Sequence, residues 1–232
     1  MIFDRTAALI GNENLNKLKK SCVAVVGIGG VGSAAAEALC RSGIGRLILL
    51  DSDNVDETNI NRQLIATTSV IGKSKCETAR LRYLDINPEC EIITLQMLYN
   101  EETSDRLFSL NPDYIIDAID TVTFKIHLIK TAVDFNIPIF SSMGTGNRLY
   151  PSEFKLGDIS ETKGCGCGLA RVMRRELKKR GITSLPVVYS TEQPKNIIID
   201  ENNRHIPASI SFCPPVAGYI LAGAVVNQII EK

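Results

Sequence analysis

Apolar segments too short for helices alternate, through the first 146 residues, with longer segments that predict helices. The apolar segments predict strands at residues 22–26, 46–50, 91–96, 114–120 and 137–141. The segments between them predict helices at residues 31–41, 74–87, 101–110 and 122–136. Strands that are apolar along nearly their whole length are typical of a parallel sheet covered on both faces. We therefore expect an α/β, Rossmann-like fold with a mostly parallel sheet and helices on both faces.

The alternation changes after residue 146. A strand at residues 153–159 precedes a glycine-rich loop at 164–168 and a basic helix at 169–180. Short strands at 187–190 and 196–199, and an apolar helix from Val216, close the chain, and a helical segment at 3–20 opens it. No repeat or linker interrupts the sequence. We expect a single domain over residues 1–232, with a core at 1–146 and a smaller C-terminal extension at 147–232.

Composition narrows the choice of partners and compartment. The 26 basic and 26 acidic residues leave no formal net charge, so only a local patch could attract nucleic acid. Seven scattered cysteines, and a first segment without the apolar core of a secretory signal, predict a reduced, cytoplasmic protein. The longest apolar run, at residues 216–230, is shorter than a membrane span and contains Asn227 and Gln228, so we expect no membrane partner.

Three glycines follow the first predicted strand with the spacing G-x-G-x-x-G, at Gly27, Gly29 and Gly32. Such a turn bends tightly and lets phosphates approach the backbone, and the helix after it points its N-terminal amides at an anion. Asp51 ends the second predicted strand, where a carboxylate can accept hydrogen bonds from a ribose. Dehydrogenases, flavoproteins and methyltransferases share this pattern, so it indicates a nucleotide but no particular reaction.

Charged residues beyond the turn favour chemistry on ATP over hydride transfer. A carboxylate that attacks the α-phosphate of ATP is an anion meeting an anion, so the site must supply positive charge, a metal and alignment. Arg62 and Lys75 are candidate phosphate ligands, and Asp120 and Asp53 are candidate oxygen ligands for Mg²⁺. From the residues alone, solvated surface charges stay open as the alternative for Arg62 and Lys75.

Six motifs resemble those of the E1-like (ThiF/MoeB/HesA) adenylating superfamily. They lie at residues 27–32, 51–53, 59–63, 72–75, 86–88 and 117–120. The resemblance runs in order and spacing from about residue 3 to residue 146. It implies an E1-like adenylation domain in which residues 1–146 bind the nucleotide and residues 147–232 bind the substrate. It also implies ATP-dependent adenylation of a carboxylate, release of pyrophosphate, and a homodimer.

The same resemblance implies roles for individual residues. Nucleotide contacts are implied for Gly27, Gly29, Gly30, Gly32, Asp51, Asp53, Asn59, Arg62, Gln63, Lys75 and Asp120. Among these, Arg62, Lys75 and Asp120 are implied to be catalytic, with Mg²⁺ on Asp120. Arg5 alone would be interpreted as a surface charge, but it sits where the superfamily has a catalytic arginine that reaches the partner subunit's ATP site.

The second half of the chain is similar to the tRNA threonylcarbamoyladenosine dehydratase group of this superfamily, at residues 169–181, 187–192 and 209–218. The similarity implies activation of the threonyl carboxylate of N6-threonylcarbamoyladenosine (t6A) at position 37 of tRNA, followed by capture of the acyl group within the same nucleoside to give a cyclic form. One face of the predicted basic helix would contact tRNA phosphates through Arg171, Arg174, Arg175 and Lys178. An ordinary solvated face is the alternative.

The cysteines bear on two competing interpretations. Cys165 and Cys167 form C-x-C, whereas superfamily members that activate ubiquitin-like proteins carry C-x-x-C pairs for structural zinc, so we do not expect zinc. This disfavours a MoeB/ThiF-type adenylyltransferase that acts on the C-terminus of a ubiquitin-like sulfur carrier. The intact charged residues disfavour a non-catalytic nucleotide-binding protein. The role of the two cysteines stays open, with a cysteine desulfurase or sulfur acceptor as a candidate partner.

Overall fold

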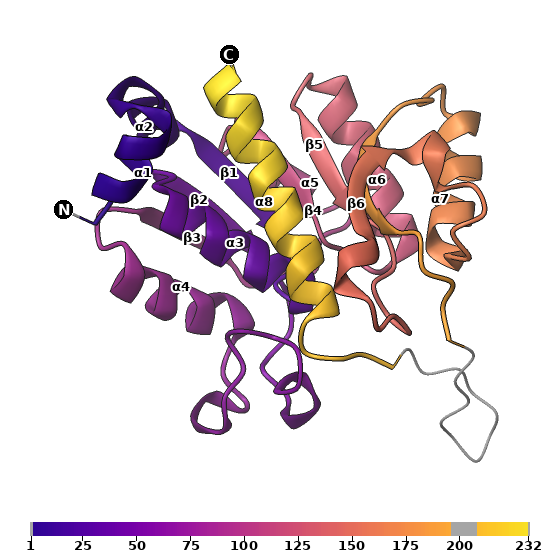
Figure 1. Ribbon diagram of the computed structural model, residues 1–232, viewed down its shortest axis with the longest axis horizontal. Helices are drawn as coiled ribbons and strands as arrows, with labels where there is room; N and C mark the ends of the chain where they lie inside the picture. The colour runs from indigo at the N-terminus through magenta and orange to yellow at the C-terminus, as the bar shows by residue number, and fades with distance from the viewer. Residues whose placement is uncertain (1, 196–207, 232) are drawn as a thin grey trace.

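One seven-stranded sheet organises the computed structural model, which describes residues 2–195 and 208–231 (Figure 1). The strand order is β3-β2-β1-β4-β5-β7-β6. The strands are β1 (Cys22–Val26), β2 (Arg46–Leu50), β3 (Glu91–Leu95), β4 (Tyr114–Asp117), β5 (Ile139–Ser142), β6 (Phe154–Asp158) and β7 (Pro186–Ser190). Every neighbouring pair is parallel except β6 and β7. The expected α/β fold with a mostly parallel sheet is confirmed.

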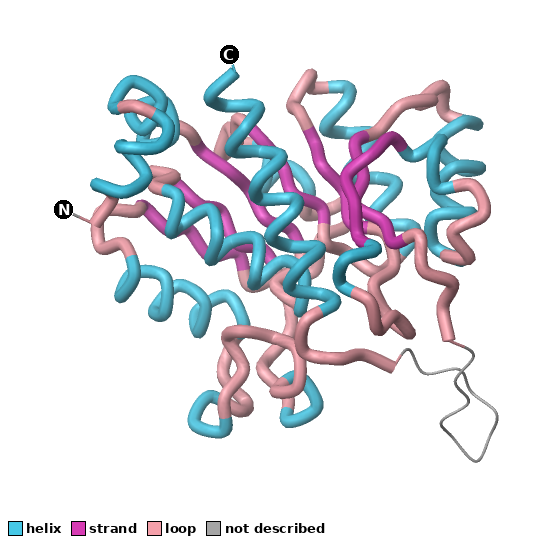
Figure 2. Tube along the Cα trace, viewed as in Figure 1, coloured by secondary structure: helices cyan, strands magenta, loops and turns pink. Residues whose placement is uncertain are grey.

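Helices cover both faces of the sheet (Figure 2). The α-helices are α1 (Asp4–Ile10), α2 (Asn12–Lys20), α3 (Gly30–Ser42), α4 (Lys75–Ile86), α5 (Ser104–Phe108), α6 (Val122–Asp134), α7 (Gly168–Lys179) and α8 (Cys213–Glu231). Short 3₁₀ helices are η1 (Glu57–Asn59), η2 (Thr68–Val70), η3 (Pro151–Glu153) and η4 (Ile159–Thr162). Val23 and Val25 of β1 pack with α2, α3, α4 and α8, whereas Ala24 and Val26 pack with α5, α6 and α7. Because strand side chains alternate between faces, β1 contributes to both cores.

Helix α8 lies directly on α3 (Figure 1). A Cβ atom on Gly218 would lie 2.3 Å from the backbone oxygen of Val31, so only glycine allows the two backbones to approach this closely. Within the described residues, α8 is the one helix long and apolar enough to cross a membrane, and half of its most apolar 18-residue window is buried inside the fold. The buried side chains belong to the core shared with α3 and the sheet, which is the position of a core helix.

Three helical segments differ from the expected ones. The helix expected at residues 101–110 is shortened to α5, because Asn100 and Thr103 bond to each other through backbone and side chain and form a turn before it. The segment expected at residues 3–20 is split into α1 and α2 by Gly11, whose φ of +83° is left-handed and interrupts a right-handed helix. The closing helix begins at Cys213 rather than Val216, because Pro214 and Pro215 fall in its first turn, where a missing N–H is tolerated.

Strand β4 ends three residues earlier than expected. Its last residue is Asp117, whose Oδ1 accepts a hydrogen bond from the backbone N of Ile119 at 3.1 Å and turns the chain out of the sheet. Asp120 therefore lies in a loop beyond the strand. β7 and β6 extend the sheet beside β5, so the two expected parts of the chain share one sheet, and the boundary at residue 146 stays a prediction. The strand expected at residues 196–199 lies outside the described residues.

Candidate active site

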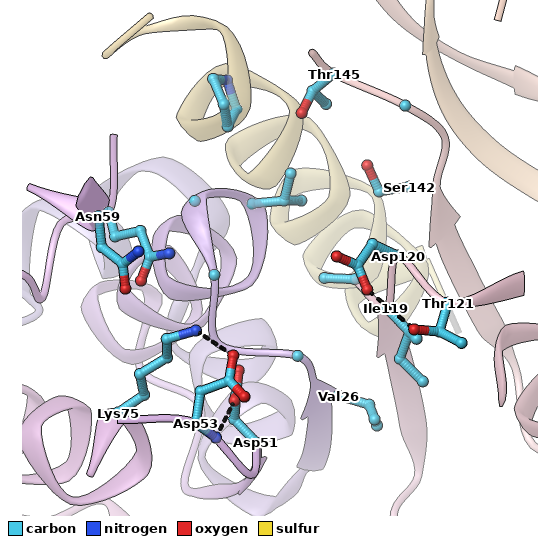
Figure 3. A pocket seen from close by; sticks show the side chains of 18 of the residues that line it. Val26, Asp51, Asp53, Asn59, Lys75, Ile119, Asp120, Thr121, Ser142 and Thr145 are labelled. Carbon is cyan, nitrogen blue, oxygen red and sulfur yellow. Dashed lines mark hydrogen bonds and ion pairs between the residues drawn. The ribbon is translucent and has the colours of Figure 1, made fainter. Parts of the chain in front are cut away.

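A pocket of about 700 Å³ opens at the carboxyl ends of β1, β2, β4 and β5 (Figure 3). Its walls come from the loops that follow these strands, at residues 27–30, 51–53, 118–121 and 143–146. Open parallel α/β sheets bind ligands at this edge. Every residue expected to contact a nucleotide lines the pocket except Gly32, which packs against the backbone of Gly27.

The glycine turn forms the floor between β1 and α3. Gly27 has a φ of +90°, and a Cβ atom there would lie 2.7 Å from the backbone oxygen of Ala118. A Cβ atom on Gly32 would lie only 1.7 Å from the backbone oxygen of Gly27, so this glycine lets the first turn of α3 close over the strand. Gly29 and Gly30 remain at the surface of the pocket, at the start of a 13-residue helix.

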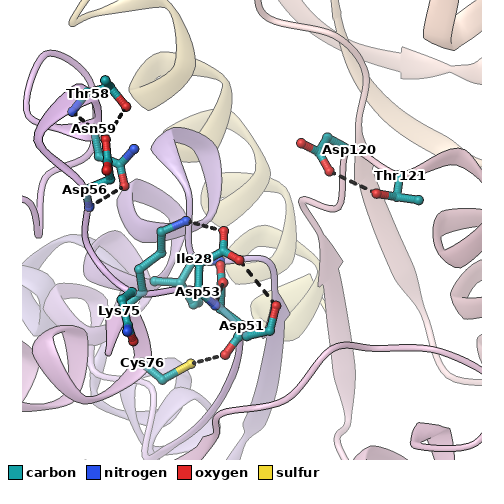
Figure 4. A network of polar contacts seen from close by, with 12 residues as sticks. Ile28, Asp51, Asp53, Asp56, Thr58, Asn59, Lys75, Cys76, Asp120 and Thr121 are labelled. Atoms are coloured by element: carbon teal, nitrogen blue, oxygen red, sulfur yellow. Dashed lines mark hydrogen bonds and ion pairs between the residues drawn. The ribbon is translucent and has the colours of Figure 1, made fainter. Parts of the chain in front are cut away.

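Asp51 joins the glycine turn to the loop after β2 (Figure 4). Its Oδ2 accepts a hydrogen bond from the backbone N of Ile28 at 2.6 Å, and its Oδ1 accepts one from the backbone N of Asp53 at 2.8 Å. Burial raises the pKa of the Asp51 carboxyl, while Lys75 and the two backbone N–H groups act in the opposite direction. Each carboxylate oxygen can accept more than one hydrogen bond, so Asp51 can still receive ribose hydroxyls.

Lys75 and Asp53 form an ion pair in the pocket, with Nζ 2.7 Å from Oδ2. Lys75 is the first residue of α4, and its backbone N also donates to the backbone oxygen of Asp53 at 3.0 Å. The lysine side chain is 8 % exposed and the aspartate side chain 63 % exposed. The ammonium group is therefore held in place, whereas its counter-ion can move towards water when a phosphate approaches.

The second cationic side chain comes from the turn after η1. Arg62 is half-buried, and its Nη1 donates to the backbone oxygen of Thr58 at 2.7 Å and to Asn61 Oδ1 at 2.9 Å. No carboxylate of the described residues forms an ion pair with it. Buried Asn59 closes a capping box by accepting from the backbone N of Asp56 at 3.2 Å. Gln63 is also buried, and its Oε1 has no hydrogen-bond partner in the described parts of the chain.

Asp120 lies across the pocket from Lys75 and Asp53 (Figures 3 and 4). Its carboxylate is exposed and accepts a hydrogen bond from Thr121 Oγ1 at 3.3 Å. The described residues contain no group of three or more His, Cys, Asp or Glu side chains that could hold a metal by themselves. A metal in this pocket would therefore need oxygens from water or from a ligand in addition to Asp120.

Arg5 does not line the pocket of its own chain. It is exposed on α1, a helix without a fully buried side chain. Exposed Leu9 lies on the same short helix. A catalytic role for Arg5 therefore requires a second copy of the chain, and that role stays a prediction.

The four cationic residues expected to contact tRNA differ in their surroundings on α7. Arg171 and Lys178 are exposed. Arg174 is half-buried and donates to Thr162 Oγ1, so part of its role is to hold α7 against η4. Arg175 lies 3.0 Å from Glu176, which also pairs with Lys179 and Arg180. These cations lower the pKa of Glu176 to about 2 and are themselves partly neutralised. The first turn of α7 reaches the pocket through Leu169.

Several lining segments were not predicted from the sequence. Residues 97–99 follow β3, and residues 142–146 end and follow β5. Both follow strands at the ligand edge, so their position in the alternating pattern could have identified them. Gly144 lies against Cys167, because a Cβ atom on the glycine would be 3.0 Å from the cysteine Sγ. No sequence signal indicated that the glycine- and cysteine-rich loop packs against a residue of the pocket wall.

Comparison with known proteins identifies relatives over almost the whole chain. The ThiF family matches residues 3–230. A Bacillus subtilis protein named tRNA threonylcarbamoyladenosine dehydratase is 45 % identical, over 99 % of this chain and 94 % of that protein. An Escherichia coli protein of the same name is 36 % identical, over 82 % of this chain and 73 % of that protein.

A solved structure agrees with these sequence relatives. The E. coli dehydratase TcdA in complex with AMP superposes with a TM-score of 0.90 at 31 % identity, and covers 98 % of this chain and 93 % of that one. The same E. coli protein has been solved with ATP, with a TM-score of 0.89. The resemblance to the E1-like superfamily and to its dehydratase group is confirmed. The chain belongs to the ThiF family.

Proposed function

We propose that this protein is an ATP-dependent tRNA threonylcarbamoyladenosine dehydratase. It adenylates the threonyl carboxylate of t6A at position 37 of tRNA and then closes the ring, as the names of its relatives and the bound nucleotides of TcdA suggest. The observation that carries the proposal is the charge arrangement of the pocket. A fixed lysine and an arginine without an acidic partner in the described residues line the same pocket as the glycine turn, and an exposed carboxylate lies across the pocket from the lysine.

The first step joins two anions. A carboxylate oxygen of the threonyl group attacks the α-phosphorus of ATP, and pyrophosphate leaves with the electron pair of the broken P–O bond. Lys75 and Arg62 offset the negative charge that accumulates at phosphorus. The phosphate replaces Asp53 as the partner of Lys75, and Asp51 holds the ribose through its free lone pairs. The glycine turn lets the phosphates approach backbone N–H groups at the start of α3.

The second step needs little from the protein. An atom of the same threonylcarbamoyl group attacks the activated acyl carbon, AMP leaves, and a proton is lost, so the nucleoside becomes lighter by one water. Because nucleophile and acyl group belong to one molecule, ring closure has a high effective concentration. The protein's part is to hold the nucleoside so that bulk water does not reach the acyl-adenylate first.

The residues present fit Mg²⁺ at Asp120. Mg²⁺ prefers oxygen ligands, takes one or two protein carboxylates, and completes its shell with waters and substrate phosphates. Asp120 is exposed at the pocket and has no cationic partner among the described residues. When bound, the metal would neutralise phosphate charge. Asp53, across the pocket, pairs with Lys75 and is proposed as a counter-ion in place of a metal ligand.

The remaining assignments concern partners. The exposed cations of α7 would contact tRNA phosphates outside the pocket, with Leu169 marking where the helix meets the nucleoside. We propose a homodimer in which Arg5 completes the partner's site, and a cytoplasmic location, where tRNA and ATP are present. A sulfur acceptor remains a candidate partner. Cys167 is the described cysteine that is not fully buried, and its thiol lies beside Gly144 of the pocket wall.

One assay tests the proposal. The purified protein is incubated with ATP, Mg²⁺ and tRNA that carries t6A, and we expect AMP together with a nucleoside lighter by one water by mass spectrometry. The same tRNA without the modification is the control and should give no AMP. Formation of AMP only with a ubiquitin-like sulfur carrier would instead support the adenylyltransferase interpretation. Nucleotide binding without AMP under all conditions would support a non-catalytic protein.

A further inference from the structure

Lys125 and Asp117 form a completely buried ion pair beside the pocket. Lys125 lies on α6 and Asp117 ends β4, with Nζ 2.8 Å from Oδ2 and both side chains 0 % exposed. Neither residue lines the pocket. Removing two charges from water is unfavourable unless further hydrogen bonds complete the pair, and a hydrophobic pair of similar volume is often as stable. A gain in the stability of the fold therefore does little to explain why this ion pair is present. Its hydrogen bonds to the neighbouring backbone indicate a different role.

The pair holds the backbone of Ile119 from both sides. Asp117 Oδ1 accepts from the backbone N of Ile119 at 3.1 Å, and Lys125 Nζ donates to the backbone oxygen of Ile119 at 3.0 Å. Asp117 Oδ2 also accepts from Ser141 Oγ at 2.7 Å, which ties β4 to β5. Both polar backbone groups of Ile119 are thus engaged by one ion pair, and the next strand fixes the pair itself.

Asp120 is attached directly to this fixed backbone. The Ile119 oxygen held by Lys125 belongs to the peptide unit that contains the backbone N of Asp120. The preceding residue, Ala118, is held by a hydrogen bond from its backbone N to the backbone oxygen of Val26 at 2.9 Å, and its own oxygen lies against Gly27. The orientation of the peptide before Asp120 is therefore fixed relative to the glycine turn.

We infer that Lys125 and Asp117 are positioning residues for Asp120. The inference rests on the proposed function in which the Asp120 carboxylate acts on the ATP phosphates. A carboxylate on an exposed loop would sample many positions, and a displacement of about 1 Å can reduce a rate about 100-fold. The buried pair limits this freedom at the peptide that precedes the carboxylate. It should therefore act on the rate of adenylation and much less on the binding of ATP, to which Lys75, Arg62 and Asp51 contribute independently.

The test uses a neutral replacement of the pair in the full-length protein. Lys125→Met alone leaves a buried carboxylate without its cation and can prevent folding, so the main variant is the double replacement Asp117→Asn with Lys125→Met. The control is Glu37→Gln, which removes another buried carboxylate that pairs with Arg82 at 2.7 Å and lies on α3 away from the pocket. Three quantities are compared: the thermal midpoint, the kcat and KM for ATP of AMP formation, and amide hydrogen exchange at residues 118–121.

The double variant should fold with a KM for ATP within about twofold of wild type and a kcat lowered at least about tenfold. Exchange of the Ile119 amide, which donates to Asp117 Oδ1, should become at least about tenfold faster. Glu37→Gln should keep the wild-type kcat and loop exchange even where its thermal midpoint falls. A double variant that keeps both kcat and the slow exchange overturns the inference, as does an equal loss of kcat in Glu37→Gln. Hydrogen exchange is measured without substrate. If the wild-type protein forms no AMP, the proposed function is wrong, but the exchange measurement still tests whether the ion pair fixes the loop.

Discussion

Lys75 Nζ lies 2.7 Å from Asp53 Oδ2, and only the lysine end of this pair is buried. The two residues are also joined through their backbones, because α4 begins at Lys75 with its N–H bonded to the Asp53 oxygen. The positive charge that we propose for the phosphates is thereby held in place beside a counter-ion that can be displaced. This arrangement gives the pocket a cation without leaving an unpaired charge in its wall.

The two ends of this pair should respond differently to substitution. Lys75→Met should lower the kcat for AMP formation about 100-fold, because it removes a fixed charge aimed at the transition state. Asp53→Asn should instead lower the Kd for ATP in EDTA about threefold, since the phosphate no longer competes with a partly exposed ion pair worth about 0.5–1 kcal/mol. Both constants can be measured by AMP release and calorimetry. Weaker ATP binding by Asp53→Asn in EDTA would contradict the role of counter-ion.

Arg62 should matter for chemistry and little for folding. Its guanidinium donates to Thr58 and Asn61 and is half-buried, so Arg62→Ala should change the free energy of unfolding by less than about 1 kcal/mol. AMP formation should fall at least about 100-fold, because the second positive charge at the phosphates is lost. Arg106→Ala, an exposed arginine on α5, is the matched control. Full activity of Arg62→Ala would remove this residue from the mechanism.

Arg5 can be tested by mixing two inactive proteins. Arg5→Ala keeps an intact pocket but supplies no arginine to its partner, and Arg62→Ala supplies Arg5 but has a defective pocket. If subunits exchange at random, half of the dimers are mixed and each contains one complete site, so about a quarter of wild-type activity should return. Activity is followed as AMP release after co-refolding. No recovery in mixtures shown to contain mixed dimers would place Arg5 outside the partner's site.

The exposed cations of α7 should affect tRNA and not ATP. Combined Arg171→Glu and Lys178→Glu should raise the KM for tRNA about tenfold and reduce its salt dependence, because both residues are exposed and would neutralise backbone phosphates. The KM for ATP should not change. Lys20→Glu, on the exposed surface of α2, is the control. An unchanged KM for tRNA would make this surface of α7 an ordinary solvated face.

Asp158 should make the free energy of unfolding depend on pH in the acid range. Burial raises the pKa of this carboxyl, but hydrogen bonds from Ser160, Ser184 and Leu185 outweigh it and lower the pKa to about 2. A lowered pKa stabilises the folded state fully above the ordinary value of 3.8, and this contribution is lost as the pH falls towards 2. Asp158→Asn should therefore lose about 1 kcal/mol at pH 7, since solvent screens a partly exposed carboxylate, and the difference should disappear as the pH falls through about 2. Urea unfolding at several pH values measures it, and a pH-independent difference would contradict this account.

Much of the fold was predictable because its signals are local. The buried strand β1, the glycine turn and helix α3 follow from apolar content, glycine spacing and length in one continuous stretch. The errors arose at the ends of elements. β4 stops at Asp117 because that side chain bonds to Ile119, and an apolar segment with a terminal carboxylate does not show where pairing stops.

The positions of Asp51, Lys75 and Asp120 at the pocket were predictable for the same reason, since each follows a strand or begins a helix at the ligand edge of the sheet, whereas Arg62 comes from the turn after η1. Their partners were not predictable. Gly32 fits the nucleotide motif but lies beneath the turn, and Arg174 fits the basic face but is bonded to Thr162. Spacing places a residue on an element, whereas its contacts depend on which other elements pack there.

The sequence by itself determined the alternation of strands and helices, the glycine turn, and the set of charges at one edge of the sheet, because each depends on neighbours within a few residues. Only the tertiary structure decided that Lys75 is paired with Asp53, that Arg5 lies outside its own pocket, and that Lys125 and Asp117 hold the peptide before Asp120. The physical reason is that burial and pairing are set by segments brought together across the sheet, and no local pattern specifies which charges then meet.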